Sequence, residues 1–112
     1  MSLQKTRLGL LGAGFMAQQA HLPCFAAAPN CEVRAIGSYR PRLAAALAET
    51  YGIPRVYADY RSLIDDPDLD AIVCIQPFHN HFHLGKEILA AGKSLFTEKP
   101  MVTRLADGQE LV

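Results

Sequence analysis

A short run of small residues, Gly12-Ala13-Gly14-Phe15-Met16-Ala17, has the residue types and spacing needed to hold a pyrophosphate. Gly12 allows a turn that a Cβ atom would block, and Gly14 lets the backbone approach an anion closely. Ala17 is small enough for a helix and a strand to pack tightly. The N–H groups and the dipole of the following helix would then face the anion. A plain tight connection has a similar composition, so the pattern alone leaves both interpretations open.

A serine and two arginines, Ser38, Arg40 and Arg42, follow the second apolar run. Domains that bind NAD usually place an acidic residue here, where it holds the 2′-hydroxyl of the ribose. This chain has none, and a hydroxyl with guanidinium groups can bind the 2′-phosphate that a carboxylate would repel. The pattern favours NADP, with NAD possible, and it favours Arg40 because Pro41 holds that residue out of the helix. The alternative is that these residues only begin a helix and face water.

A polar loop from Gln76 to His81 follows the fourth apolar run. His79, His81 and His83 alternate, but the segment changes from loop to helix, so these side chains would not converge on a metal ion. We therefore predict no metal site, and we expect one of the histidines to line a pocket.

Lys99 ends the fifth apolar run, beside Glu98 and before Pro100, which fixes the direction in which the chain leaves. A lysine at the end of a buried strand either stays charged through Glu98 or has its pKa lowered by desolvation, which would suit it to proton transfer. A surface salt bridge is the alternative, and the spacing alone does not decide between these interpretations.

The elements that position these residues follow from hydrophobic periodicity. Strands are predicted at residues 7–11, 33–37, 55–57, 71–75 and 94–97. Helices are predicted from Phe15 to about Ala28 with an end or kink near Leu22 caused by Pro23, from Pro41 to Gly52, after a cap at Asp59, from Leu84 to Ala91, and after a cap at Thr103. This alternation predicts an α/β fold, a doubly wound parallel sheet (Rossmann) with strand order 3-2-1-4-5. The polar residues that follow the strands would meet at the carboxyl edge of that sheet, where ligands bind.

The composition limits what the chain can bind. Its 112 residues suffice for one domain, and 11 Lys and Arg residues balance 11 Asp and Glu residues, so no net field attracts nucleic acid or a membrane. No apolar run approaches the ~18 residues of a membrane span. The N-terminus does not have the pattern of a signal peptide, which predicts a cytoplasmic protein. Cys24, Cys31 and Cys74 are predicted to be buried reduced thiols, and residues 65–68 a solvated acidic turn.

Several motifs together resemble the Gfo/Idh/MocA family of oxidoreductases, the glucose–fructose oxidoreductase and inositol dehydrogenase type. They are the Gly12–Ala17 loop, His21-Leu22-Pro23, Pro77 with His81, Ala91-Gly92-Lys93, and Glu98-Lys99-Pro100. The resemblance covers the whole chain in register, and Glu-Lys-Pro is its most specific mark. It implies an N-terminal Rossmann domain that binds NAD or NADP for hydride transfer at a sugar, cyclitol or related hydroxyl or carbonyl group.

The resemblance also implies roles for residues. Lys99 would be the catalytic residue, close to the nicotinamide and the reacting hydroxyl, and Pro77 and His81 would belong to a loop under the cofactor. The expected cofactor-binding residues are Gly12, Gly14, Phe15, Met16, Ser38, Arg40, Arg42, Gln76, Pro77, His81, Glu98 and Lys99. Gln76 and Phe78 depart from the threonine and asparagine that the family often has around this proline.

The length is the largest departure. The family carries a second α+β domain that closes the substrate pocket, supplies an Asp or His for acid–base work and usually builds the oligomer. We therefore expect residues 1–112 to be a truncated dinucleotide-binding domain that is inactive alone, from a protein that is a homo-oligomer at full length. A cofactor-binding sensor or regulator without catalysis is the alternative, and the presence of Lys99 favours the enzyme. A Rossmann domain without any ligand is disfavoured by the glycine loop and the arginines.

Overall fold

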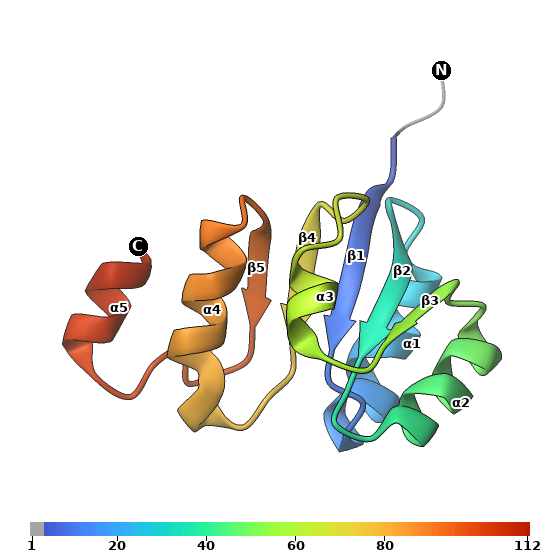
Figure 1. Ribbon diagram of the computed structural model, residues 1–112, viewed down its shortest axis with the longest axis horizontal. Coiled ribbons are helices and arrows are strands. Elements are labelled where there is room, and N and C mark those ends of the chain that lie inside the picture. Colours follow the sequence, from blue (N-terminus) through green and yellow to red (C-terminus); the bar gives the residue numbers. More distant parts are fainter. Residues whose placement is uncertain (1–3) are drawn as a thin grey trace.

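The computed structural model describes residues 4–112, which form a parallel five-stranded sheet between helices (Figure 1). The strands are β1 (Thr6–Leu11), β2 (Cys31–Gly37), β3 (Arg55–Tyr57), β4 (Ala71–Cys74) and β5 (Ser94–Thr97). Their order in the sheet is β3-β2-β1-β4-β5, and each neighbouring pair is parallel. The predicted fold class and strand order are therefore confirmed.

Helices connect these strands. They are the π-helix η1 (Ala17–His21), α1 (Leu22–Ala27), α2 (Pro41–Tyr51), α3 (Tyr60–Ile64), the 3-10 helix η2 (Phe78–Asn80), α4 (His81–Ala90) and α5 (Leu105–Leu111). Three predicted helix signals are confirmed: Pro41 begins α2, Gly52 ends it in the left-handed region at φ 68°, and the Asp59 carboxylate accepts the Ser62 N–H at 2.9 Å. Within residues 4–112, the helices are too short or too polar to cross a lipid bilayer.

Two helix boundaries differ from the prediction. The helix after the glycine loop does not end near Leu22, but it is irregular there as predicted: the π turn η1 gives way to α1 at Leu22, whose N–H bonds to the Ala17 carbonyl, and α1 continues through Pro23 to Ala27. The last helix is not capped by Thr103. Arg104 is the extended residue before α5, and its side chain makes no capping hydrogen bond.

The core has two halves because successive side chains of a strand point to opposite faces of the sheet. On one face, Leu10 of β1 packs in a cluster with Leu22 of α1 and Ala44 of α2. On the other face, Leu11 lies in a cluster with Leu63 of α3. Adjacent residues of β1 thus pack against helices on opposite faces of the sheet. This packing fixes the carboxyl end of β1 between the two helix layers.

The prediction of three buried thiols is wrong for Cys24, which is exposed on α1. Cys31 is partly buried, and Cys74 is buried in β4. Burial disfavours the thiolate and raises the pKa of Cys74 to about 12. All three cysteines are free.

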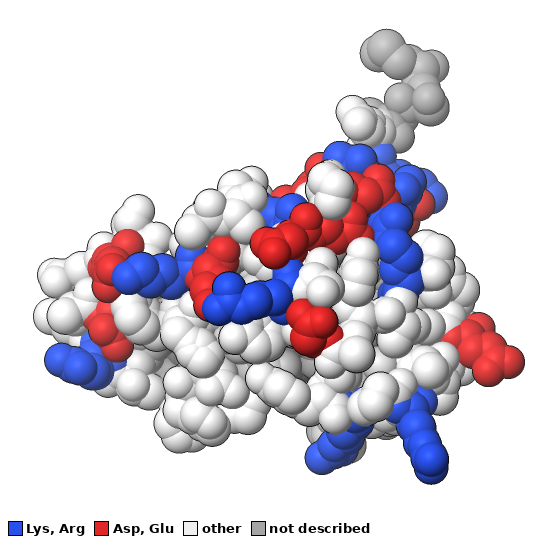
Figure 2. All heavy atoms as spheres, in the orientation of Figure 1, with Lys and Arg blue, Asp and Glu red and all other residues white. Residues whose placement is uncertain are grey.

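The predicted solvated turn at residues 65–68 is wrong for two of its carboxylates, which pair with arginines, whereas Asp65 is exposed as predicted. Asp66 is buried, and its carboxylate lies 3.1 Å from Arg55 Nε. The Asp68 carboxylate accepts hydrogen bonds from Arg7, Arg34 and Arg55. Figure 2 shows acidic and basic side chains gathered at the top of the molecule, over the amino ends of the strands. These ion pairs hold the edge of the sheet opposite to the predicted ligand edge.

Candidate functional site

The candidate site is the edge of the sheet where the strands end. Because the strands are parallel, the loops that follow β1, β2, β4 and β5 all leave from this edge, which is the lower one in Figure 1. These loops contain the glycine run, Ser38 to Arg42, Gln76 to Asn80, and Glu98 to Pro100. The topology thus brings the predicted site segments to one edge.

Gly12 fits between three strands in a way that no other residue can match. Its φ of 127° is in the region that favours glycine, and a Cβ atom there would lie 2.2 Å from the carbonyl oxygen of Ile75. Its N–H donates to the Gly37 carbonyl at 2.8 Å. Gly12 therefore lets the loop after β1 settle between the ends of β2 and β4.

Gly14 lies in open space. A Cβ atom at Gly14 would meet no atom of residues 4–112 within 4 Å. Phe15 and Met16, which follow it, are exposed at the start of the helix. The Gln18 side chain donates to the Ala13 carbonyl at 2.9 Å and so holds the loop against the helix. The loop presents an open backbone surface next to a helix N-terminus, which is the environment that a pyrophosphate requires.

The end of β2 presents two free guanidinium groups. Arg40 and Arg42 are exposed, and neither takes part in an ion pair with the described part of the chain. The Arg40 N–H donates to Ser38 Oγ at 3.0 Å, which orders the turn before Pro41. This edge therefore offers cationic groups to an anionic ligand.

The loop after β4 is in contact with a buried histidine, His81. The Gln76 side-chain amide donates to the Leu11 carbonyl at 3.3 Å, while Pro77 is exposed. His81 is 2% exposed, and its Nε2 and Nδ1 lie 2.8 Å and 2.5 Å from the carbonyl oxygens of Gln76 and Pro100. His81 thus links the loop after β4 to the segment after β5. His79 and His83 are exposed, and residues 4–112 hold no cluster of side chains placed to bind a metal.

The segment after β5 differs from the prediction in two respects. β5 is not buried: it lies at the edge of the described sheet, and Ser94 and Phe96 are exposed. Glu98 does not pair with Lys99, because its carboxylate contacts Nε2 of His21. Lys99 is exposed and is in no ion pair within residues 4–112. The lysine is therefore available to a ligand at this edge.

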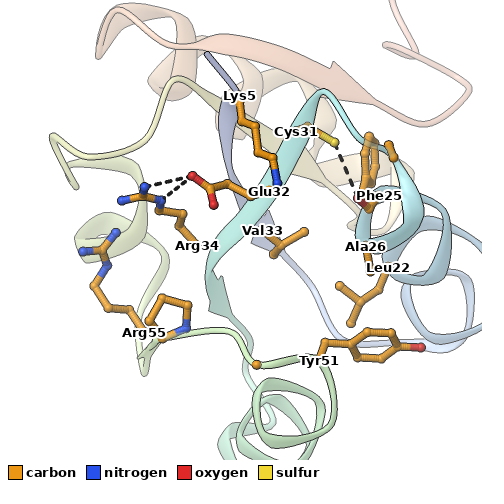
Figure 3. Close-up of a pocket in the computed structure, with 13 residues that line it drawn as sticks. Lys5, Leu22, Phe25, Ala26, Cys31, Glu32, Val33, Arg34, Tyr51 and Arg55 are labelled. Carbon is orange, nitrogen blue, oxygen red and sulfur yellow. Dashed lines mark hydrogen bonds and ion pairs between the residues drawn. The ribbon is translucent and has the colours of Figure 1, made fainter. Parts of the chain in front are cut away.

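A cavity of about 560 Å³ lies away from this edge (Figure 3). Leu22, Phe25 and Val33 form its apolar wall, and charged residues including Glu32 and Arg34 line its rim. Arg34 is occupied, because its guanidinium contacts Glu32 at 2.8 Å and also Asp68. The cavity belongs to the ion-paired edge of the sheet, and the chemistry-bearing loops lie at the other edge.

The sequence of residues 6–112 matches the Gfo/Idh/MocA family model, which is described as an oxidoreductase family with an NAD-binding Rossmann fold. The match includes each of the site segments above.

Two curated relatives illustrate the similarity. Levoglucosan dehydrogenase from Pseudarthrobacter phenanthrenivorans is 36% identical over 107 residues, which cover 88% of this chain and 27% of that protein. The dTDP-3,4-didehydro-2,6-dideoxy-alpha-D-glucose 3-reductase of Streptomyces violaceoruber is 34% identical over 111 residues, which cover 99% of this chain and 32% of that protein. The chain thus spans about a third of these relatives or less.

A solved structure has the same fold. KijD10, a 3-ketoreductase from Actinomadura kijaniata, crystallised in complex with NADP and TDP-benzene, superposes with a TM-score of 0.92 at 30% identity. The superposition covers 96% of this chain and 33% of KijD10.

Proposed function

Because the chain belongs to the Gfo/Idh/MocA oxidoreductase family, we propose that residues 1–112 are the dinucleotide-binding domain of an NADP-dependent oxidoreductase. Its substrate would be a sugar, a cyclitol or a related compound with a hydroxyl or carbonyl group. The activities for which levoglucosan dehydrogenase, the dTDP-sugar 3-reductase and KijD10 are named support this substrate class. The observation that carries the proposal is that the open glycine loop, Arg40 and Lys99 all lie at the carboxyl edge of the sheet, where neither side chain is in an ion pair within residues 4–112.

The residues at this edge suit NADP. The open backbone at Gly14 and the helix start at Phe15 would hold the pyrophosphate, because a Cβ at Gly14 has free space and the helix dipole favours an anion. Ser38, Arg40 and Arg42 would hold the 2′-phosphate through charge-assisted hydrogen bonds. The proposed cofactor site has six further members, which would contact the cofactor or hold the loops in place around it: Met16, Gln76, Pro77, His81, Glu98 and Lys99.

Lys99 would move the proton of the reaction. Bound NADP supplies hydride-transfer chemistry at its nicotinamide ring. When the substrate hydroxyl is oxidised, its proton must leave, and the Lys99 amine would accept it; in the reverse direction the Lys99 ammonium would donate it. Exposure of Lys99 at the carboxyl edge supports this role.

A second domain would complete the proposed enzyme. Apolar side chains, including Met101 and Leu105, are exposed around a depression of about 650 Å³ next to α5. An exposed apolar surface of this kind supports the proposal that a second domain covers it. We also propose a cytoplasmic homo-oligomer with no nucleic-acid or membrane partner, and the balanced charge of the chain supports the last point.

The proposal is tested by replacing Lys99 in the complete enzyme. Lys99→Ala should lower kcat by about 10²- to 10⁴-fold, because a positioned proton-transfer group contributes that much, while NADP still binds and the fold survives. Steady-state kinetics and circular dichroism measure both effects, with His83→Ala at an exposed histidine as the control. The 112-residue chain alone should be inactive. Unchanged turnover in Lys99→Ala, or dehydrogenase activity of the isolated chain, would overturn the assignment.

A further inference from the structure

The two residues that flank Lys99 each contact a histidine from another part of the chain. The residue before it, Glu98, contacts His21 through its carboxylate. The residue after it, Pro100, contacts His81 through its carbonyl oxygen. Lys99 itself is exposed and lacks an ion pair within residues 4–112, so only its neighbours fix where its side chain leaves the backbone.

His21 brings the glycine-loop helix to this segment. It is the last residue of η1, and its side chain is 14% exposed. Its ring packs against two aromatic rings, with centroids 6.5 Å from that of Phe25 and 5.8 Å from that of Phe96. These rings fix the direction of Nε2, which meets the Glu98 carboxylate. The segment that carries Lys99 is thereby attached to the helix that begins at the glycine loop.

His81 attaches the same segment to the loop after β4. The ring is buried at the start of α4, with one nitrogen at the Pro100 carbonyl and the other at the Gln76 carbonyl. A carbonyl oxygen only accepts hydrogen bonds and a neutral imidazole has one N–H, so the neutral ring donates to one of these carbonyls and packs against the other, which belongs to a different loop. A change in the path of either loop would break one of these contacts.

We propose that His21 and His81 are positioning residues that clamp the backbone around Lys99 and so fix the lysine relative to the glycine loop. This inference rests on the proposed function for its consequence in the reaction, since a proton-transfer group must be placed accurately to act. The clamp itself is a property of this chain and is measurable without a substrate.

The first test measures backbone motion in the isolated chain by ¹⁵N relaxation. The Lys99 amide should have an order parameter near the rigid value of about 0.85, and His21→Phe should lower it below about 0.6. Phenylalanine keeps the aromatic packing with Phe25 and Phe96 but removes the donor to Glu98. His21→Gln, which keeps a donor, should restore most of the order. His83→Phe, the same change at an exposed histidine of α4, should alter nothing.

If His21→Phe fails to fold, Glu98→Leu removes the same contact by changing the carboxylate that His21 meets. Glu98 is partly exposed and therefore tolerates substitution better. Equal order at Lys99 in wild type, His21→Phe and Glu98→Leu would overturn the clamp. A loss of order in His21→Gln as large as that in His21→Phe would overturn it too, because the contact would then not depend on the donor.

The second test measures the consequence in the complete enzyme. His21→Phe should lower kcat by about ten- to a hundredfold and leave the KM for the cofactor unchanged, and His21→Gln should recover most of the loss. A fall in order at Lys99 with no change in kcat would overturn the positioning role. A wild-type enzyme that neither binds NADP nor turns over would contradict the proposed function instead, and the relaxation data would still decide the clamp.

Discussion

At the scale of single residues, the two glycines of the loop have different physical roles. Gly12 is fixed by the fold, since its positive φ and its approach to the Ile75 carbonyl leave no room for a side chain. Gly14 has open space in front of it, so the fold does not require a glycine there. The free space at Gly14 is what a pyrophosphate would use.

Substituting the two glycines separates stability from binding. Gly12→Ala should lower the free energy of unfolding by at least about 2 kcal/mol, because alanine would be strained at this φ and would clash with the backbone of Ile75. Gly14→Ala should change it by less than about 0.5 kcal/mol and should weaken NADP binding instead. Urea unfolding and NADP titration of both variants measure these effects. Equal destabilisation by the two substitutions would contradict the division of roles.

Residue types and spacing could single out Gly12 and Arg40 as candidate site residues, and the resemblance to the family added Lys99. They could not identify the partners of these residues. The contact of His21 with Glu98 joins positions 77 residues apart. No local pattern relates the two, and only the packing of the glycine-loop helix against β5 brings them together.

At the scale of elements, the two edges of the sheet are stabilised differently. The amino ends of β1, β2 and β3 are joined by arginines that share Asp68. Hydrogen bonds from Arg55 and Arg34 hold the pKa of Asp68 at about 2, and hydrogen bonds from Arg7 hold the pKa of Asp70 at about 2. The charged network thus stabilises the sheet from the edge opposite to the candidate site.

The network predicts a loss of stability in acid. Because these pKa values are lower in the folded state, the stability they provide is complete above the ordinary carboxyl pKa of 3.8 and is lost as the pH falls toward about 2. Urea unfolding at a series of pH values should show this decline. Asp68→Asn should be less stable at neutral pH and should lose less stability in acid. An acid decline equally steep in Asp68→Asn would show that Asp68 does not contribute to it.

Most elements followed from periodicity and from turn residues, because buried strands and capped helices have strong local signals. The strand order followed from the rule that crossovers are right-handed. The signals failed where tertiary packing decides: the side chains of β5 are not buried, Cys24 faces solvent, and Asp66 is buried in contact with an arginine of β3. The predicted strand order already places β5 at the edge, but hydrophobicity alone does not say how far the side chains of that strand are covered.

At the scale of the whole molecule, the two edges differ in charge. Paired acidic and basic groups occupy the amino edge, whereas Arg40 and Arg42 lie without ion pairs at the carboxyl edge, within the part of the chain that the structure describes. Basic side chains project at the lower edge of Figure 2. An anionic ligand is therefore favoured at the carboxyl edge, although the chain as a whole carries no net charge.

Calorimetric titration of NADP and NAD into the wild-type chain and into Arg40→Ala tests the central claim most directly. Wild type should bind NADP at least about tenfold more tightly than NAD, because charge-assisted hydrogen bonds to the 2′-phosphate are each worth roughly 1.5–3 kcal/mol before solvent exposure reduces them. Arg40→Ala should lose most of this preference and keep its affinity for NAD. Lys5→Ala, which removes a cation at the amino edge, should leave both affinities unchanged. Equal affinities for the two cofactors in wild type, or an unchanged preference in Arg40→Ala, would contradict the proposed NADP site.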